Sequence, residues 1–358
     1  MNAVSVVMMI FSIIGGLDRI LGNKLGLGKE FERGLMLLGD LALSMIGMIV
    51  ISPLLARLIA PALNLLYDVT GIDPSSFTSM LFANDMGGAA LAREVARNEQ
   101  IGRFNGMVSA SMMGCTISFT VAFALNSVKQ HQHKPLLLGL LCGIVTIPVG
   151  CFAGGLILHI PAGALLYNLL PLLIFSLLVA SGLMLFPELS TKIFGILGMM
   201  IKALITIGLI LGIVRSLSGY EIVDGLNQLE DAGIICLNAA VVMTGAFPLL
   251  RIISKVLGRR LNTIGKRFGI NEASSLGLIS CVANSISTFD MMENMNEKGV
   301  MLNAAFSVSA AFIFGDHLAF TLAYDPMCLP GVIVGKLTAG MLALLAANFI
   351  YSRLYRES

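Results

Sequence analysis

Apolar runs long enough to cross a lipid bilayer recur along the chain and alternate with short polar segments. A bilayer core about 30 Å thick needs roughly 20 apolar residues in a helix. No formal charge interrupts residues 104–128, 135–158, 160–187 and 232–250. Five further runs qualify with one or two ionisable residues inside them: 3–21, 34–56, 193–214, 299–324 and 329–352. The pattern predicts an all-α polytopic membrane protein with about nine full spans.

Two other regions are apolar for only about a dozen residues and then turn polar. Residues 81–88 read L-F-A-N-D-M-G-G, and residues 281–290 read C-V-A-N-S-I-S-T-F-D. Apolar stretches of about 10–14 residues are typical of re-entrant segments and half-helices. We therefore expect a broken-helix hairpin in each of the regions 72–97 and 272–298.

The two broken regions belong to an internal repeat. Identical residues recur in the same order at separations of 195–200 positions: Pro53 with Pro248, Ala83-Asn84 with Ala283-Asn284, Asn105 with Asn303, Ser109 with Ser307, Ser111 with Ser309, and Pro135 with Pro330. This order predicts a first repeat over residues 1–158, a connecting transmembrane helix over 159–188 and a second repeat over 189–358. If the hairpins re-enter without crossing, five crossings precede the second repeat, so the two repeats are inverted.

Loop charges set the expected orientation. The loop 251–267 holds six basic residues and no acid, which favours the cytoplasmic side. Counting spans outward from this loop places the N-terminus outside and the C-terminus inside. The loop 93–103 disagrees, because its three arginines face outward and two glutamates balance them only in part.

Composition narrows the class further. Hydrophobic residues make up 56% of the chain and charged residues only 12%, whereas a soluble domain carries about 25%. The net charge of +2 gives no sign of nucleic-acid binding. The six cysteines lack zinc-site spacing and a secreted disulfide setting. Nucleotide, metalloprotease and hydrolase motifs are absent, so we expect neither an enzyme nor a cofactor or metal site. A secondary transporter or a channel remains.

Polar backbone breaks at mid-membrane point to a substrate site. Unpaired backbone groups are tolerated there only inside protein or against a water-filled cavity, and paired broken helices in inverted repeats usually flank the substrate. Carbonyls and carboxylates at such breaks suit a small cation or an ammonium group. The expected substrate-binding residues are Asn84, Asp85, Asn284, Ser285, Ser287, Thr288, Asp290 and Asp316. His317 and Asp40 are candidates for proton coupling, because ionisable residues inside spans are functional hypotheses by default.

Each of these residues also has a structural interpretation. Asp85 can cap the helix that follows it, and Asn84 and Asn284 can satisfy their own hairpin backbones. Asp290 can mark the membrane interface. Asp316 can be the partner of His317, or both can lie near the outer interface.

The sequence resembles the ethanolamine-utilisation transporter family (EutH) over nearly its whole length. The resemblance rests on A-N-D-M-G-G at 83–88 with the downstream L-A-R-E, on A-N-S-I-S-T-F-D-M-M at 283–292, and on F-G-D-H-L-A-F at 314–320. It implies uptake of ethanolamine across a bacterial cytoplasmic (inner) membrane. The expected partners are ethanolamine or a related small amine and the lipid bilayer. An ion-coupled symporter, or a channel-like facilitator, for another small amine or polar metabolite remains an alternative. A homo-oligomer is suggested only by analogy with other transporters that contain re-entrant hairpins.

Overall fold

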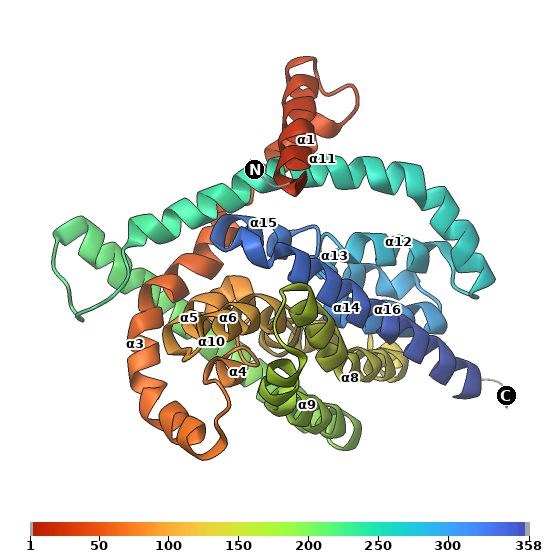
Figure 1. Ribbon diagram of the computed structural model, residues 1–358. Coiled ribbons are helices and arrows are strands. Elements are labelled where there is room, and N and C mark those ends of the chain that lie inside the picture. The colour runs from red at the N-terminus through yellow and green to blue at the C-terminus, as the bar shows by residue number, and fades with distance from the viewer. Residues whose placement is uncertain (1–2, 355–358) are drawn as a thin grey trace.

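The computed structural model describes residues 3–354, apart from the side chains of residues 257, 259 and 261. In this range the chain is helical and contains no strand (Figure 1). Eight of the described segments are long and apolar enough to cross a membrane: Ala3–Ile20, Leu27–Thr70, Glu99–Ser127, Gln130–Ile157, Ala162–Leu185, Pro187–Ser218, Leu229–Val256 and Pro326–Leu354. The all-helical class and the multiple apolar spans are thus confirmed.

The ninth expected span, over residues 299–324, is not continuous. The chain forms α14 (Glu297–Ala310) and α15 (Asp316–Tyr324), with a non-helical segment between them. Ala311 is extended at ψ 144° and Phe312 has φ +62°. Hydropathy does not detect this break, because residues 311–314 are all apolar.

Two long helices frame the molecule. They are α3 (Leu38–Thr70) and α11 (Leu229–Arg267), and at 1.5 Å per residue they reach about 50 and 58 Å. α10 (Pro187–Ser218) packs along α3, whereas α1 (Ala3–Ile20) and α2 (Leu27–Met36) pack on α11. Figure 1 shows α11 extended across one side of the bundle with α1 beyond it. The leading helices of each half therefore lie against the long helix of the other half.

The last helices of the two halves form the closest pair in the core. α8 (His133–Ile157) and α16 (Leu329–Leu354) contact each other more extensively than any other two elements described. Small residues permit this approach: a Cβ on Gly154 would lie 2.5 Å from the carbonyl oxygen of Gly331. The Thr146 hydroxyl donates to the Ala339 carbonyl at 3.1 Å. Close backbone contact through small residues is how helices associate in lipid, where no hydrophobic force drives them together. α9 (Ala162–Leu185) lies along the other side of α8.

Short helices fill the centre between these layers. In the first half they are α4 (Ser75–Thr78), η1 (Asn84–Gly88), α5 (Ala89–Val95), α6 (Glu99–Phe104), η2 (Asn105–Gly114), η3 (Thr116–Thr120), α7 (Val121–Ser127) and η4 (Gln130–Gln132). In the second half they are α12 (Glu272–Cys281), α13 (Ser285–Asp290), η5 (Met291–Asn294) and η6 (Pro326–Cys328). The expected breaks near Asn84 and Asn284 are thus real interruptions of helix. The predicted orientation of the chain ends refers to residues 1, 2 and 355–358, which lie outside the described residues.

Candidate functional site

The first break is enforced by a glycine. Ala83 is extended at ψ 150°, and Gly87 adopts φ +93°, a left-handed conformation that residues with a Cβ rarely take. A Cβ on Gly87 would also lie 2.5 Å from the Cβ of Met48 on α3. The amides of Met86 and Gly88 donate back to the Ala83 carbonyl at 3.1 and 2.8 Å. These bonds satisfy part of the unwound backbone and hold Asp85 at the turn.

The second break is held by the discontinuity between α14 and α15. The amide of Phe312 donates to the Cys281 carbonyl at 3.1 Å, and the amide of Phe314 donates to the Val282 carbonyl at 2.8 Å. A Cβ on Gly315 would lie only 2.0 Å from the Ala283 carbonyl oxygen. Two non-helical segments therefore satisfy each other's backbone, which is how such segments persist where water is excluded.

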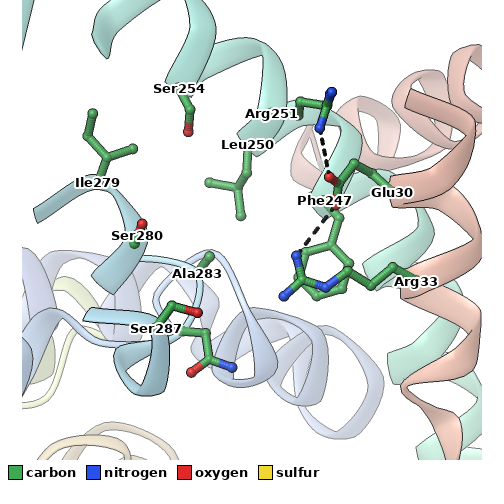
Figure 2. A pocket seen from close by; sticks show the side chains of 11 residues that line it. Glu30, Arg33, Phe247, Leu250, Arg251, Ser254, Ile279, Ser280, Ala283 and Ser287 are labelled. Carbon is green, nitrogen blue, oxygen red and sulfur yellow. Dashed lines mark hydrogen bonds and ion pairs between the residues drawn. The ribbon is translucent and has the colours of Figure 1, made fainter. Parts of the chain in front are cut away.

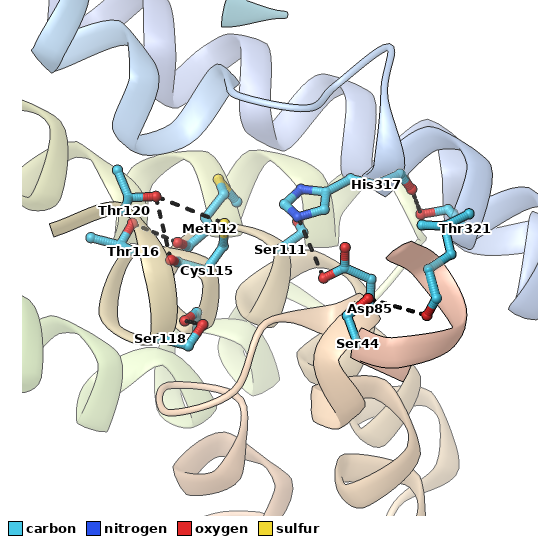
Figure 3. A network of polar contacts seen from close by, with 12 residues as sticks. Ser44, Asp85, Ser111, Met112, Cys115, Thr116, Ser118, Thr120, His317 and Thr321 are labelled. Atoms are coloured by element: carbon cyan, nitrogen blue, oxygen red, sulfur yellow. Dashed lines mark hydrogen bonds and ion pairs between the residues drawn. The ribbon is translucent and has the colours of Figure 1, made fainter. Parts of the chain in front are cut away.

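Asp85 and His317 come together from the two halves of the chain. His317 Nε2 lies 3.8 Å from Asp85 Oδ1, with 2% and 14% of the respective side chains exposed (Figure 3). α15, which carries His317 in its first turn, packs against η1. Neither η1 nor α5 has a side-chain cap at its N-terminus, so the capping interpretation of Asp85 is wrong. Asp85, rather than Asp316, is the carboxylate partner of His317.

Lys336 is a buried cation that the sequence-based site prediction omitted. Only 1% of it is exposed, and its Nζ donates to the Ser111 carbonyl at 2.7 Å. Its charge acts on Asp85 and on the thiols of Cys115, Cys151 and Cys281. Ser111 lies in η2, a π-helical stretch, and π-helical turns often occur at functional sites. The signal was present in the sequence, because Lys336 is an ionisable residue inside an apolar span.

The hydroxyls of the neighbouring π-helical turns bond to backbone carbonyls. Thr116 donates to the Met112 carbonyl at 2.7 Å and lies 3.2 Å from the Val308 carbonyl of the second half. Ser118 donates to the Gly114 carbonyl at 2.7 Å, and Thr120 lies 3.3 Å from the Cys115 carbonyl, to which it donates (Figure 3). Because these hydroxyls are already bonded to backbone carbonyls, the polar groups at the breaks are the ones left to contact a ligand.

Several fully buried polar atoms at the breaks have no hydrogen-bond partner within the described residues. They are both amide atoms of Asn84, the hydroxyls of Ser285 and Ser309, and Nδ1 of His317. More than nine in ten buried polar groups in proteins are bonded, and an unbonded one costs about 1–3 kcal/mol. Such a concentration is what a site for a small polar ligand requires.

The remaining predicted residues separate into engaged and exposed groups. Thr288 donates to the Gly277 carbonyl at 3.0 Å, and the side chain of Asn284 caps α13 through the amide of Ile286 at 2.7 Å. Asp316 is partly exposed at the start of α15. Asp40 and Asp290 are exposed, so the structure does not bring them into the buried cluster. Among the described residues, no group of three or more His, Cys, Asp or Glu side chains is placed to share a metal ion.

A cavity of about 260 Å³ reaches the second break from one side (Figure 2). Asn284 and Ser287 line its inner wall, and Glu30, Arg33 and Arg251 line its outer part. Arg251 bonds Glu30 at 3.2 Å, and Arg33 lies 3.6 Å from Glu30. The guanidinium of Arg33 also stacks 4.6 Å from the ring centre of Phe247. The second break is therefore accessible through a charged mouth formed by α2 and α11.

Comparisons with known proteins point to one family. Residues 1–350 match the family model described as "Ethanolamine utilisation protein, EutH". The chain is 40% identical over 351 residues to a probable ethanolamine permease EutH of Listeria monocytogenes, covering 98% of this chain and 94% of the relative. It is 35% identical to the proteins of the same name from Salmonella typhimurium and Escherichia coli, over 96% of this chain and 94% of each relative. No solved structure matches the chain.

Proposed function

Because the chain belongs to the EutH family, we propose that it is a permease, not an enzyme, and that it carries ethanolamine into the bacterial cytoplasm. The relatives are named as probable ethanolamine permeases. One observation supports the cargo above all others. At the first break, one carboxylate, Asp85, is largely withdrawn from water and lies 3.8 Å from His317. A carboxylate in such a place is a suitable partner for an ammonium group.

The cluster also offers partners for the hydroxyl of ethanolamine. Protonated ethanolamine carries an ammonium and a hydroxyl only two carbons apart. In the proposed complex the ammonium lies against Asp85, with Asp316 contributing to the field. The unbonded amide of Asn84 and the unbonded hydroxyl of Ser285 are available to the alcohol. Asn284 and Ser287 then act at the cavity side of the same path.

We propose two inverted repeats, over residues 1–158 and 189–358, joined by the connecting helix at 159–188. Each half runs from a long helix through a broken hairpin to a closing helix. The exchanged packing of α10 on α3, and of α1 and α2 on α11, supports this symmetry. The basic segment 251–267 supports a cytoplasmic position for the charged mouth, with the N-terminus outside and the C-terminus inside the inner membrane.

Proton coupling is the mechanism that the Asp85–His317 contact favours. Contacts between His and Asp side chains inside a membrane form the proton relays of pumps and transporters, and binding of an ammonium beside Asp85 would alter the balance of charge there. A channel-like facilitator or an ion-coupled symporter for another amine is the alternative.

Transport into proteoliposomes tests this proposal. Purified protein should accumulate labelled ethanolamine, and an imposed pH gradient should raise the level above equilibrium. Unlabelled ethanolamine should compete, whereas choline and amino acids should compete far less. Equilibration without accumulation would instead support a facilitator, and absence of ethanolamine transport in active vesicles would refute the proposed cargo.

A further inference from the structure

A second cavity, of about 470 Å³, lies between the C-terminal half of α11 and the helix α16. Residues of α12 and α14 complete its wall, and Figure 1 shows α11 bending around α12 at this end of the molecule. Four large apolar side chains of the wall are exposed: Ile264 and Phe268 on α11, and Met341 and Leu345 on α16. The cavity therefore opens onto the apolar outer surface of the bundle, which is the surface that a bilayer covers.

Water is a poor occupant of this cavity. A buried water needs two to four polar partners, but the only lining side chains with a nitrogen or oxygen atom are Ser275 and Asn348. The Ser275 hydroxyl already donates to the Asn271 carbonyl at 3.2 Å. An empty apolar cavity forfeits the dispersion contacts of its walls, so a hydrocarbon chain is the favoured occupant.

Two arginines lie on the face of α11 that lines the cavity. At 3.6 residues per turn, Arg260 and Arg267 fall within about 40° of the lining residue Ile253 around the helix axis. Both arginines are exposed, and neither forms an ion pair with any residue that the structure describes. By the same spacing, Lys255 and Lys266 lie on the opposite face of the helix. The apolar cavity is thus bordered by positive charge that the described chain does not neutralise.

We propose that this cavity binds an anionic phospholipid, with an acyl chain between α11 and α16 and the phosphate against Arg260 and Arg267. Arginine pairs with a phosphate through two parallel hydrogen bonds, and its long side chain can run from an apolar surface to the level of the head groups. Basic pockets between membrane helices bind anionic head groups in this way. The Oδ1 atom of Asn348, which has no hydrogen-bond partner in the described chain, is available to a head-group hydroxyl.

The site adjoins the second break without being part of the charged mouth. Val282 and Phe314 line it, and the amide of Phe314 donates to the Val282 carbonyl at 2.8 Å. Ile279 lines both this cavity and the one at the mouth. A bound acyl chain would therefore pack against the break from the lipid side and stabilise it. The inference concerns a lipid rather than the cargo, so it does not depend on the proposed function.

A lipid titration tests the proposal. The whole chain, purified in neutral detergent and stripped of lipid, receives phosphatidylglycerol or phosphatidylcholine with the same acyl chains. Melting temperature reports stabilisation, and native mass spectrometry counts the bound lipids. Phosphatidylglycerol should raise the melting temperature at a concentration about tenfold lower than phosphatidylcholine, and Arg260→Gln with Arg267→Gln should reduce this preference to within about twofold.

Matched variants separate the site from general charge and packing. Lys255→Gln with Lys266→Gln removes the same charge from the opposite face of α11 and should keep the preference. Leu345→Trp fills the cavity from an exposed position on α16 and should abolish stabilisation by both lipids. Leu337→Trp, at an exposed position on α16 outside the cavity, should leave it unchanged.

Loss of the preference in the arginine pair alone, together with loss of lipid in Leu345→Trp, supports the proposal. An equal loss in the lysine pair would show only a general attraction of the basic segment to anionic lipid, and would overturn the site. Equal stabilisation by the two lipids would overturn the assignment of the phosphate to the arginines. A dimer in detergent that Leu345→Trp dissociates would show that a second copy of the chain fills the cavity, which also overturns the proposal.

Discussion

The two breaks occupy equivalent places in the sequence but differ in chemistry. The first, at 83–88, holds a carboxylate beside His317 and a buried amide with no partner in the described chain. The second, at 282–285, uses its asparagine to cap α13 and opens onto a cavity. The two segments thus differ in what they contain: the first holds a carboxylate, and the second ends a helix and lines a cavity. An Ala-Asn pair at both places does not imply the same role for both asparagines.

The largest effect should come from removing the charge at the first break. Asp85→Asn keeps the shape of the side chain but deletes the partner of the ammonium, so we expect ethanolamine kcat/KM to fall about a thousandfold, or ~4 kcal/mol. Uptake into proteoliposomes measures it. Asp68→Asn, an identical change at an exposed position on α3, is the matched control and should stay within about twofold. Equal activity of the two variants would remove Asp85 from the site.

Both breaks depend on a glycine, but for different physical reasons. Gly87→Ala must hold φ +93° with its Cβ 2.5 Å from that of Met48, whereas Gly315→Ala has negative φ and collides with the Ala283 carbonyl at 2.0 Å. We expect each variant to lose about 2–3 kcal/mol of stability in thermal unfolding.

The control for these glycines is Gly195→Ala. Its Cβ meets no atom within 4 Å and lies inside α10, so it should raise stability by about 0.5–1 kcal/mol. If all three variants unfold at the same temperature, the close approaches at the breaks are not rigid.

The two asparagines provide the sharpest contrast between the breaks. Asn84→Ala removes buried amide atoms that have no described partner, so folding stability should hold or rise by about 1 kcal/mol, while uptake falls about tenfold through the lost hydroxyl contact. Asn284→Ala loses the cap on Ile286 and should cost about 1 kcal/mol of stability with a smaller loss of uptake. Melting temperature and uptake, measured on both variants, test whether Asn84 contributes mainly to uptake and Asn284 mainly to stability. Identical behaviour in both assays would show that the breaks are equivalent.

The sequence predicted the positions of the breaks better than their chemistry. Long stretches of apolar residues identify membrane helices, and Asn84 and Asn284 are polar interruptions that can be recognised in the sequence. The interruption at 311–315 was missed because its residues are apolar and the break is stabilised by bonds to Cys281 and Val282, some 30 residues away. Asp85 is largely buried and Asp290 is exposed. The sequence could not distinguish them, because charge alone does not say which carboxylate faces the core. Lys336 was readable as an intramembrane cation, but its bond to Ser111 depends on packing between α16 and η2.

The smallest effect concerns ion pairs that follow the two hairpins. Beyond the first break, Arg103 at the end of α6 bonds both oxygens of Asp325 at 2.6 Å, with 29% and 13% of the side chains exposed. Beyond the second break, Lys129 pairs with Glu293 at 54% and 56% exposure. Exposed pairs contribute about 0–1 kcal/mol, so Lys129→Gln should change the free energy of unfolding by less than about 0.5 kcal/mol. Arg103→Gln should cost several times more, because a half-buried bidentate pair is stronger and its loss leaves Asp325 uncompensated.

Thermal unfolding at low and high salt measures the loss of stability in both variants. Only the small contribution of the Lys129 pair should disappear at high salt. If Lys129→Gln lost more stability than Arg103→Gln, the ion pair after the second hairpin would be the stronger of the two, contrary to this prediction.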